Sequence, residues 1–235
     1  MRAFRWDMFT EFFVKILPYI SVTLTYVVGS VLFGFFIGIG IAMLRLSKKR
    51  ALQVIGSLYV TIFRSVPSVV LLFVIYYGLP MWVENSFGII LEDTDTIVYV
   101  IVTFSLLLGS SMSEIIRTSY LAVPKGQYEA AVMVGLTPFT AIRRIVFPQG
   151  FVVALPNFGN IFIFMIKEGA LAYTIGLHDI LGRGMYLGGL KANVYNLELY
   201  LALTFIYWPC TFILEKAFKM WEKSLRNKRK KEKIC

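Results

Sequence analysis

The chain has 235 residues, of which 57% are hydrophobic and only 16% charged, and its formal net charge at pH 7 is +10. Ordinary soluble domains are about 45–50% apolar, and a water-soluble chain of this length could not hide so much apolar surface. The composition therefore excludes an ordinary soluble protein and predicts an all-α membrane protein. The two cysteines, one inside an apolar run and one at the last position, suggest neither a disulfide framework nor a zinc site.

The N-terminal segment, residues 1–19, mixes charged and aromatic side chains. Phe4, Trp6 and Phe9 lie among Arg5 and Asp7, which is typical of an amphipathic segment lying on a membrane surface. No small-residue cleavage site precedes the first apolar run, so we do not expect a cleaved signal peptide here. We predict an interfacial anchor.

Five apolar segments follow, each long enough to cross a hydrocarbon core of about 30 Å. The second is interrupted by Arg64 and Pro67, and the third carries Glu114 and Arg117 near its end. The expected membrane spans are residues 20–44, 52–79, 97–120, 151–173 and 197–214.

The first span contains Gly34 and Gly38, which have the spacing that allows membrane helices to pack closely. Glycines scattered in a membrane helix without such a role are an equal alternative. The connection 80–96 is acidic, and the Gly-rich connection 174–196 has room for a short helix.

Basic residues orient the chain. The loop 45–50 carries four Lys or Arg and no acid, and residues 219–235 carry eight against two Glu. These segments contribute +4 and +6, the whole formal net charge, whereas the loop 80–96 has no Lys or Arg. Because basic loops stay in the cytoplasm, we place the C-terminus inside and the N-terminus outside. The basic tail 219–235 is interpreted as contacting anionic lipid rather than nucleic acid.

The stretch 121–150 joins the third and fourth spans and is too polar to cross lipid. Residues 128–135 predict a short helix, and Gly135 at its end is expected to adopt a left-handed conformation that reverses the chain. Thr137 is then the N-cap, with Pro138 at the first position, of a second helix through Ile145. The product is a helical hairpin held at a membrane face.

The chain lacks the phosphate loop G-x-x-x-x-G-K-[ST] and the catalytic motifs H-E-x-x-H and G-x-S-x-G. Its one histidine, His178, has no nearby cysteine or second histidine and is interpreted as a loop residue. An intramembrane enzyme would need facing titratable groups, and only Glu114 and Glu168 supply carboxylates within the spans. We therefore expect no enzyme activity, no metal and no cofactor.

Residues 129–131 (EAA), followed by Gly135 and by residues 145–148 (IVFP), make the hairpin resemble the EAA signature of ABC importer permeases, the cytoplasmic loop that docks the ATPase subunit. The resemblance implies a type I ABC importer transmembrane domain with five helices over residues 20–218, followed by a cytoplasmic tail. The ATPase-coupling residues that it implies are Glu129, Ala130, Ala131, Gly135, Ile145 and Pro148.

Residues 63–67 (FRSVP), 76–80 (YYGLP) and 123–127 (VPKGQ) are similar to permeases for polar amino acids, and the resemblance covers about residues 20 to 215. Where that family usually has Asp-Thr-Ser-Leu, this chain has residues 168–171 (EGAL), and Ser65 replaces the expected glycine. The implied partners are an ABC ATPase dimer, an external solute-binding protein, a second permease copy (identical or related) and membrane lipids. The implied cargo is a polar amino acid or an analogue such as cystine. An importer for another small solute, and a non-ABC carrier or channel, are the alternatives.

Charges inside a bilayer are costly and tend to face protein or a water-filled cavity. Arg64 lies roughly twelve residues, or about 18 Å, into the second span, and Pro67 frees polar backbone groups at that depth. An amino acid carries a carboxylate and an ammonium, so a cavity holding both an Arg and a Glu suits it. The alternative is a buried Arg64–Glu114 pair that only holds helices together. The predicted substrate-pathway residues are Arg64, Glu114, Asn160 and Glu168.

Overall fold

The computed structural model describes residues 3–91 and 94–232, and the regular elements within them are all helical. The helices are α1 (Trp6–Ile16), α2 (Ile20–Leu46), α3 (Arg50–Ser65), α4 (Ser68–Phe87), α5 (Thr96–Leu121), α6 (Lys125–Met133), α7 (Pro138–Ala141), α8 (Phe147–Glu168), α9 (Ile180–Leu190) and α10 (Asn196–Glu232). Three other helical segments join some of them. They are the 3₁₀ helices η1 (Leu17–Tyr19) and η3 (Gly169–Ile175) and the π-helix η2 (Ile142–Val146).

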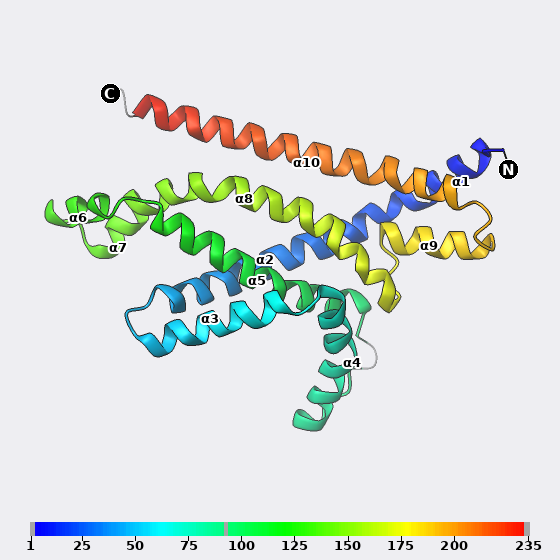
Figure 1. The fold of residues 1–235 in the computed structure, drawn as a ribbon, viewed down its shortest axis with the longest axis horizontal. Coiled ribbons are helices and arrows are strands. Elements are labelled where there is room, and N and C mark those ends of the chain that lie inside the picture. Colours follow the sequence, from blue (N-terminus) through cyan, green and yellow to red (C-terminus); the bar gives the residue numbers. More distant parts are fainter. Residues whose placement is uncertain (1–2, 92–93, 233–235) are drawn as a thin grey trace.

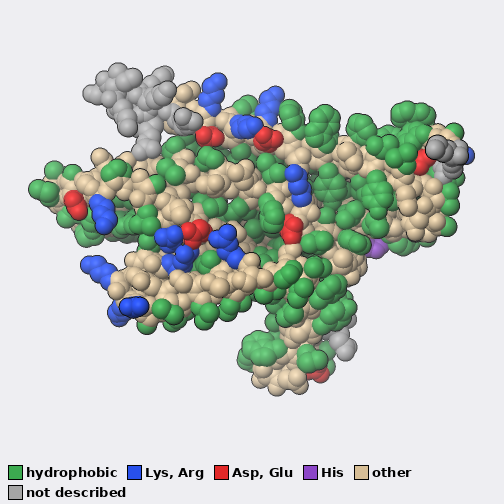
Figure 2. All heavy atoms as spheres, in the orientation of Figure 1, with side chains coloured by type: hydrophobic (Ala, Val, Ile, Leu, Met, Phe, Trp, Pro, Cys, Tyr) green, Lys and Arg blue, Asp and Glu red, His purple; other side chains and the backbone are tan. Residues whose placement is uncertain are grey.

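Helices α2, α5, α8 and α10 run along the long axis of the molecule (Figure 1). The α2–α3 turn, the α6–α7 hairpin and the end of α10 lie at one end of this bundle, whereas α1 and α9 lie at the other. Lys and Arg side chains gather on the half of the visible face that carries the hairpin (Figure 2). The two ends of the molecule therefore differ in charge as the loop sequences predict.

Five helical segments are long and apolar enough to cross a membrane, which confirms the five-span, all-α prediction. They are Trp6–Leu46, Ser68–Phe87, Thr96–Leu121, Pro138–Ile175 and Asn196–Leu225. Four of them contain the corresponding predicted spans. The second differs, because the predicted span 52–79 is divided between two helices.

The break in the second predicted span is at Val66 and Pro67. Val66 has φ −88° and ψ 129°, an extended conformation imposed on the residue before a proline, whose ring clashes with a helical predecessor. Helix α3 ends there, and α4 starts in a new direction and projects from the side of the bundle (Figure 1). The candidate span is α4 alone, so the predicted bounds of the second span, 52–79, were wrong.

The N-terminal helix is continuous with the first span through η1. Phe12 and Ile16 on α1 are fully buried against Ile180 of α9 and Leu199 of α10, while Trp6 and Val14 are exposed. One face of the amphipathic segment thus packs on protein, where the sequence predicted an anchor in the membrane surface. Only the exposed face remains available for lipid.

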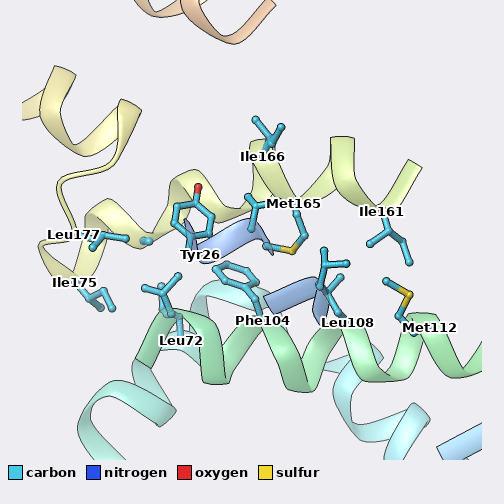
Figure 3. Close-up of a cluster of buried hydrophobic side chains, with 14 residues drawn as sticks. Tyr26, Leu72, Phe104, Leu108, Met112, Ile161, Met165, Ile166, Ile175 and Leu177 are labelled. Atoms are coloured by element: carbon cyan, nitrogen blue, oxygen red, sulfur yellow. The ribbon is translucent and has the colours of Figure 1, made fainter. Parts of the chain in front are cut away.

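Close packing of α2 on α5 forms the core. An ideal Cβ on Gly34 would lie 2.7 Å from Cβ of Leu108, and one on Gly38 would lie 2.5 Å from Cβ of Met112. The two glycines therefore let the helix backbones approach, as their spacing predicts. Around this contact Tyr26, Phe104, Leu108 and Met112 join side chains of α8 in one buried cluster (Figure 3).

The remaining connections are more helical than predicted. Helix α4 continues through Pro80 to Phe87, so residues 80–87 of the acidic connection 80–96 are helix; Glu92 and Asp93 lie outside the described residues. Helix α9 occupies the Gly-rich connection, and His178 precedes it as an exposed loop residue whose ring lies 5.1 Å from that of Tyr186, measured between centroids. The tail is helical to residue 232, and residues 233–235 lie outside the described part.

Candidate functional site

The hairpin between α5 and α8 has the turn chemistry that its sequence predicts. Gly135 has φ +91°, its N–H donates to the Val132 carbonyl at 3.0 Å, and the Leu136 N–H donates to the Ala131 carbonyl at 3.1 Å. These two bonds form a Schellman motif, which ends a helix with a left-handed residue. Thr137 Oγ1 accepts from the Thr140 N–H at 3.3 Å, so the predicted N-cap is also confirmed.

The helix bounds in the hairpin differ from those predicted. The first helix starts earlier, at Lys125, because Pro124 is its N-cap; the second does not stop at Ile145. It passes through the π turn η2 into α8, where Pro148 sits in the first turn. The missing N–H of Pro148 interrupts the helical hydrogen bonds at the point where the wider π turn meets α8. The second arm of the hairpin is thus continuous with the fourth span.

The predicted coupling residues differ in solvent exposure. Glu129 and Ala130 are exposed, whereas Ala131 is buried at 7% exposure. Ile145 is half-buried and Pro148 is exposed on the second arm. Glu129, Ala130 and Pro148 are therefore accessible to a partner, whereas Ala131 packs inside the hairpin.

The tip of the hairpin carries three exposed apolar side chains that the sequence analysis did not single out. Met133 is 86% exposed, Val134 80% and Phe139 71%. Apolar residues on both sides of Gly135 were the available signal. An exposed apolar cluster of this kind is typical of a surface that contacts another protein or a membrane.

A cavity of about 230 Å³ lies at the α3–α4 break, against α5 and α8. Arg64 of α3 and Glu168 of α8 both line it, and the Ser68 hydroxyl at the start of α4 donates to the Glu168 carboxylate. Among the described residues Arg64 has no ion pair. Two of the four predicted pathway residues thus share one cavity and present opposite charges to it.

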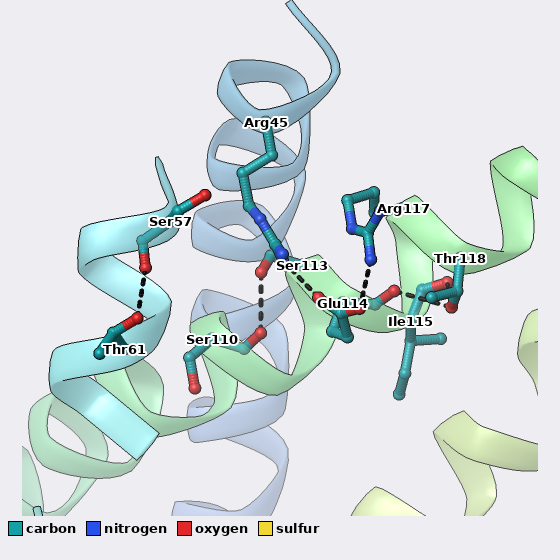
Figure 4. Close-up of polar contacts among 9 residues, drawn as sticks. All are labelled: Arg45, Ser57, Thr61, Ser110, Ser113, Glu114, Ile115, Arg117 and Thr118. Carbon is teal, nitrogen blue, oxygen red and sulfur yellow. Dashed lines mark hydrogen bonds and ion pairs between the residues drawn. The ribbon is translucent and has the colours of Figure 1, made fainter. Parts of the chain in front are cut away.

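Glu114 lies elsewhere. Its carboxylate accepts from Arg117, one turn further along α5, at 2.6 Å, and also pairs with Arg45 at the end of α2 (Figure 4). The alternative pairing of Glu114 with Arg64 is therefore wrong. Asn160 is exposed on α8 and does not line the 230 Å³ cavity. Neither residue is brought to Arg64 by this fold.

A buried polar cluster at the opposite end escaped the sequence analysis. Asp179 is fully buried; it caps α9 by accepting from the Gly182 N–H at 2.8 Å, and it accepts from the Tyr26 hydroxyl at 3.2 Å. Burial raises the pKa of Asp179 to about 6. The sequence Asp-x-x-Gly is that of an ordinary helix N-cap, and no residue near Asp179 in the sequence indicates its contact with Tyr26.

These features, a membrane bundle and a rigid polar hairpin at one end, can be compared with known proteins. The family model for the binding-protein-dependent transport system inner membrane component matches residues 30–227. The chain belongs to this family. As such a permease it is a multi-pass inner-membrane subunit of an ABC importer, and ATP hydrolysis belongs to a separate subunit.

The permease is 35% identical over 225 residues to the L-cystine transport system permease protein TcyL of Bacillus subtilis, covering 96% of this chain and 93% of that one. It is 32% identical to the probable amino-acid permease protein YxeN of the same organism, over 96% and 97% of the two chains. Among solved structures, an amino acid ABC transporter with histidines matches with a TM-score of 0.79 and 26% identity, over 95% of this chain and 100% of that chain. This neighbour supports the type I importer fold.

Proposed function

We propose that this permease carries a polar amino acid, of the size and polarity of cystine, into the cell. Relatives named for cystine and amino-acid transport support this cargo. The observation that carries the proposal is the pairing of Arg64 and Glu168 on one cavity.

The cavity suits a zwitterion for electrostatic reasons. An α-carboxylate would accept from the Arg64 guanidinium, and an α-ammonium would donate to Glu168, which Ser68 already orients. Charged hydrogen bonds strengthen where water is excluded, and apolar Phe104, Leu108 and Met165 form the cavity wall. A solute without charged groups would leave Arg64 and Glu168 without a partner of opposite charge.

Uptake kinetics of the assembled importer test this assignment. Arg64→Gln and Glu168→Gln should each raise the KM for the amino acid about tenfold or more while the complex stays intact, because each removes one charged contact of about 1.5–3 kcal/mol. Asn160→Ala and Glu114→Gln complete the set of predicted pathway residues, and effects confined to complex stability would remove them from the pathway. Unchanged KM in both Arg64 and Glu168 variants would contradict the proposal.

We place the hairpin end of the permease in the cytoplasm and the N-terminus outside, on the basis of loop charge. Cysteines introduced at Asn85 and at Asn227 should then label from opposite sides of intact cells. Labelling of both from outside would contradict this orientation. At the cytoplasmic end the hairpin would seat in a groove of an ABC ATPase, with an external solute-binding protein at the opposite end.

A second permease copy is part of the proposal because α4 is poorly covered. Only 11% of the residues in the most apolar stretch of α4 are buried, whereas 56% of those in the corresponding stretch of α5 are buried. Val74, Tyr77 and Trp82 are all more than half exposed. A second copy, identical or related, would cover α4 and close the cavity beside it. Cross-linking of a single cysteine at Val74 between copies tests this arrangement, and its absence in the assembled importer would count against it.

A further inference from the structure

The ring of Tyr26, on α2, lies against the point where α8 passes into η3. An ideal Cβ on Gly169, the first residue of η3, would lie 2.7 Å from the Tyr26 hydroxyl oxygen and 2.8 Å from its Cζ. Gly169 has φ −62° and ψ −20°, a right-handed helical conformation open to every residue. Glycine is therefore needed at this position for space, because the tyrosine ring occupies the volume that a side chain would fill.

Hydrogen bonds to the start of α9 hold this ring in place. Tyr26 is fully buried in the cluster of Figure 3, and its hydroxyl donates to Asp179, the N-cap of α9, at 3.2 Å. Thr23, one turn earlier on α2, accepts from the Ile180 N–H at 3.3 Å. Helix α2 is thus bonded to the start of α9 at two neighbouring points. Turning the Tyr26 ring away from Gly169 would break its bond to a buried carboxyl group, which costs free energy.

Gly169 directly follows Glu168, the last residue of α8, whose carboxylate accepts from Ser68 and lines the 230 Å³ cavity. Tyr26 is not one of the described residues that line this cavity. We infer that Tyr26 is a positioning residue: its ring fixes the place where η3 leaves α8, and so keeps the Glu168 carboxylate on the cavity that it shares with Arg64. A charged group binds its ligand well only when the surrounding packing holds it in one place. The inference rests on the proposed function in one respect, the role of Glu168 in holding the cargo.

Cross-linking of residues 68 and 168 measures this geometry without any cargo. In the full chain with Cys210 and Cys235 replaced by Ser, cysteines are placed at Ser68 and Glu168 and joined by a short bifunctional methanethiosulfonate. Tyr26→Phe keeps the buried ring and removes only the hydroxyl that bonds it to α9. The rate of cross-linking should then fall about three- to fivefold, as expected for the loss of one hydrogen bond. An unchanged rate would overturn the inference.

Tyr99→Phe is the matched control. Tyr99 is also a buried tyrosine, and its hydroxyl donates to the Leu91 carbonyl at the same distance, 3.2 Å. Removing that hydroxyl breaks a comparable hydrogen bond at a residue that does not line the cavity, so the cross-linking rate should stay unchanged. Equal falls in the Tyr26 and Tyr99 variants would show only a general loss of stability and would overturn the inference.

Uptake kinetics of the assembled importer give the functional readout. Tyr26→Phe should raise the KM for the amino acid about three- to fivefold and leave kcat unchanged, because the contact with the bound cargo is loosened. Gly169→Ala displaces the same ring and should raise KM by a similar factor. The double variant should be no worse than the worse single variant, since both changes break one contact. Effects that multiply would overturn the inference.

Two combined outcomes separate this inference from the proposed cargo. Slower cross-linking in Tyr26→Phe, together with an unchanged KM in Arg64→Gln and Glu168→Gln, would support the positioning role and contradict the cargo. A raised KM in Glu168→Gln, together with unchanged cross-linking and an unchanged KM in Tyr26→Phe, would support the cargo and overturn the positioning role.

Discussion

Replacing one of two nearby glycines in α2 should separate packing from helix propensity. Gly38 and Gly40 lie in the same helix, so alanine improves helix propensity by up to about 1 kcal/mol at either position. Their surroundings differ. A Cβ on Gly38 would lie 2.5 Å from Cβ of Met112 and 3.1 Å from the Ser113 backbone nitrogen, whereas one on Gly40 meets nothing within 4 Å.

The clash at Gly38 cannot be relieved by rotating a side chain, because the atoms it meets are a Cβ and the backbone. Helices α2 and α5 must separate instead, and overpacking of this kind costs about 1–3 kcal/mol. We therefore expect Gly38→Ala to lower the free energy of unfolding by about 1–2 kcal/mol and Gly40→Ala to leave it unchanged or raise it. Unfolding in mixed micelles, followed by far-ultraviolet circular dichroism, measures both. Equal shifts in the two variants would refute the α2–α5 packing described here.

Three further changes test other parts of the structure. Gly135→Ala forces a side chain into φ +91° and should cost about 1 kcal/mol of unfolding free energy, whereas Gly126→Ala within α6, where a Cβ meets nothing, should cost none. Glu114→Gln should lower the free energy of unfolding by about 1–3 kcal/mol, discounted for partial exposure, because two arginines lose their shared carboxylate. An unchanged free energy of unfolding would show that the pairs contribute nothing. Because the pKa of Asp179 is raised by folding, its contribution to stability is greatest below about pH 4 and is lost as the pH rises through about 6, by roughly 2–3 kcal/mol. Asp179→Asn keeps the cap on α9 and should flatten this dependence in a thermal melt, and a retained slope would assign it to another group.

The sequence predicts features that depend on neighbouring residues. The cap at Thr137 and the reversal at Gly135 were readable because each is set by the conformation of one or two residues. The spans were readable because apolar length is a property of a continuous segment. The direction that the chain takes after Pro67 was not, since a proline fixes where a helix breaks but not where the next one packs.

Contacts between distant residues account for what the sequence did not predict. The expected alternative partner of Glu114 was Arg64, whereas the structure pairs it with Arg117 on its own helix and with Arg45 from another helix. Tyr26 and Asp179 meet only because α2 and the start of α9 are brought together at the end of the bundle opposite the hairpin. The pairing of Arg64 with Glu168 on one cavity required both the helix break and the path of α8.

ATP-driven uptake tests the central claim most directly, namely that this permease is driven through its hairpin. The assembled importer, reconstituted in proteoliposomes with its ATPase and binding protein, should accumulate the amino acid only when ATP is present. Gly135→Arg and Glu129→Lys should abolish that uptake while the permease still inserts, and Glu84→Lys, an equal charge reversal at the far end of α4, should retain it. Uptake preserved in both hairpin variants, or lost only with missing protein, would contradict the account.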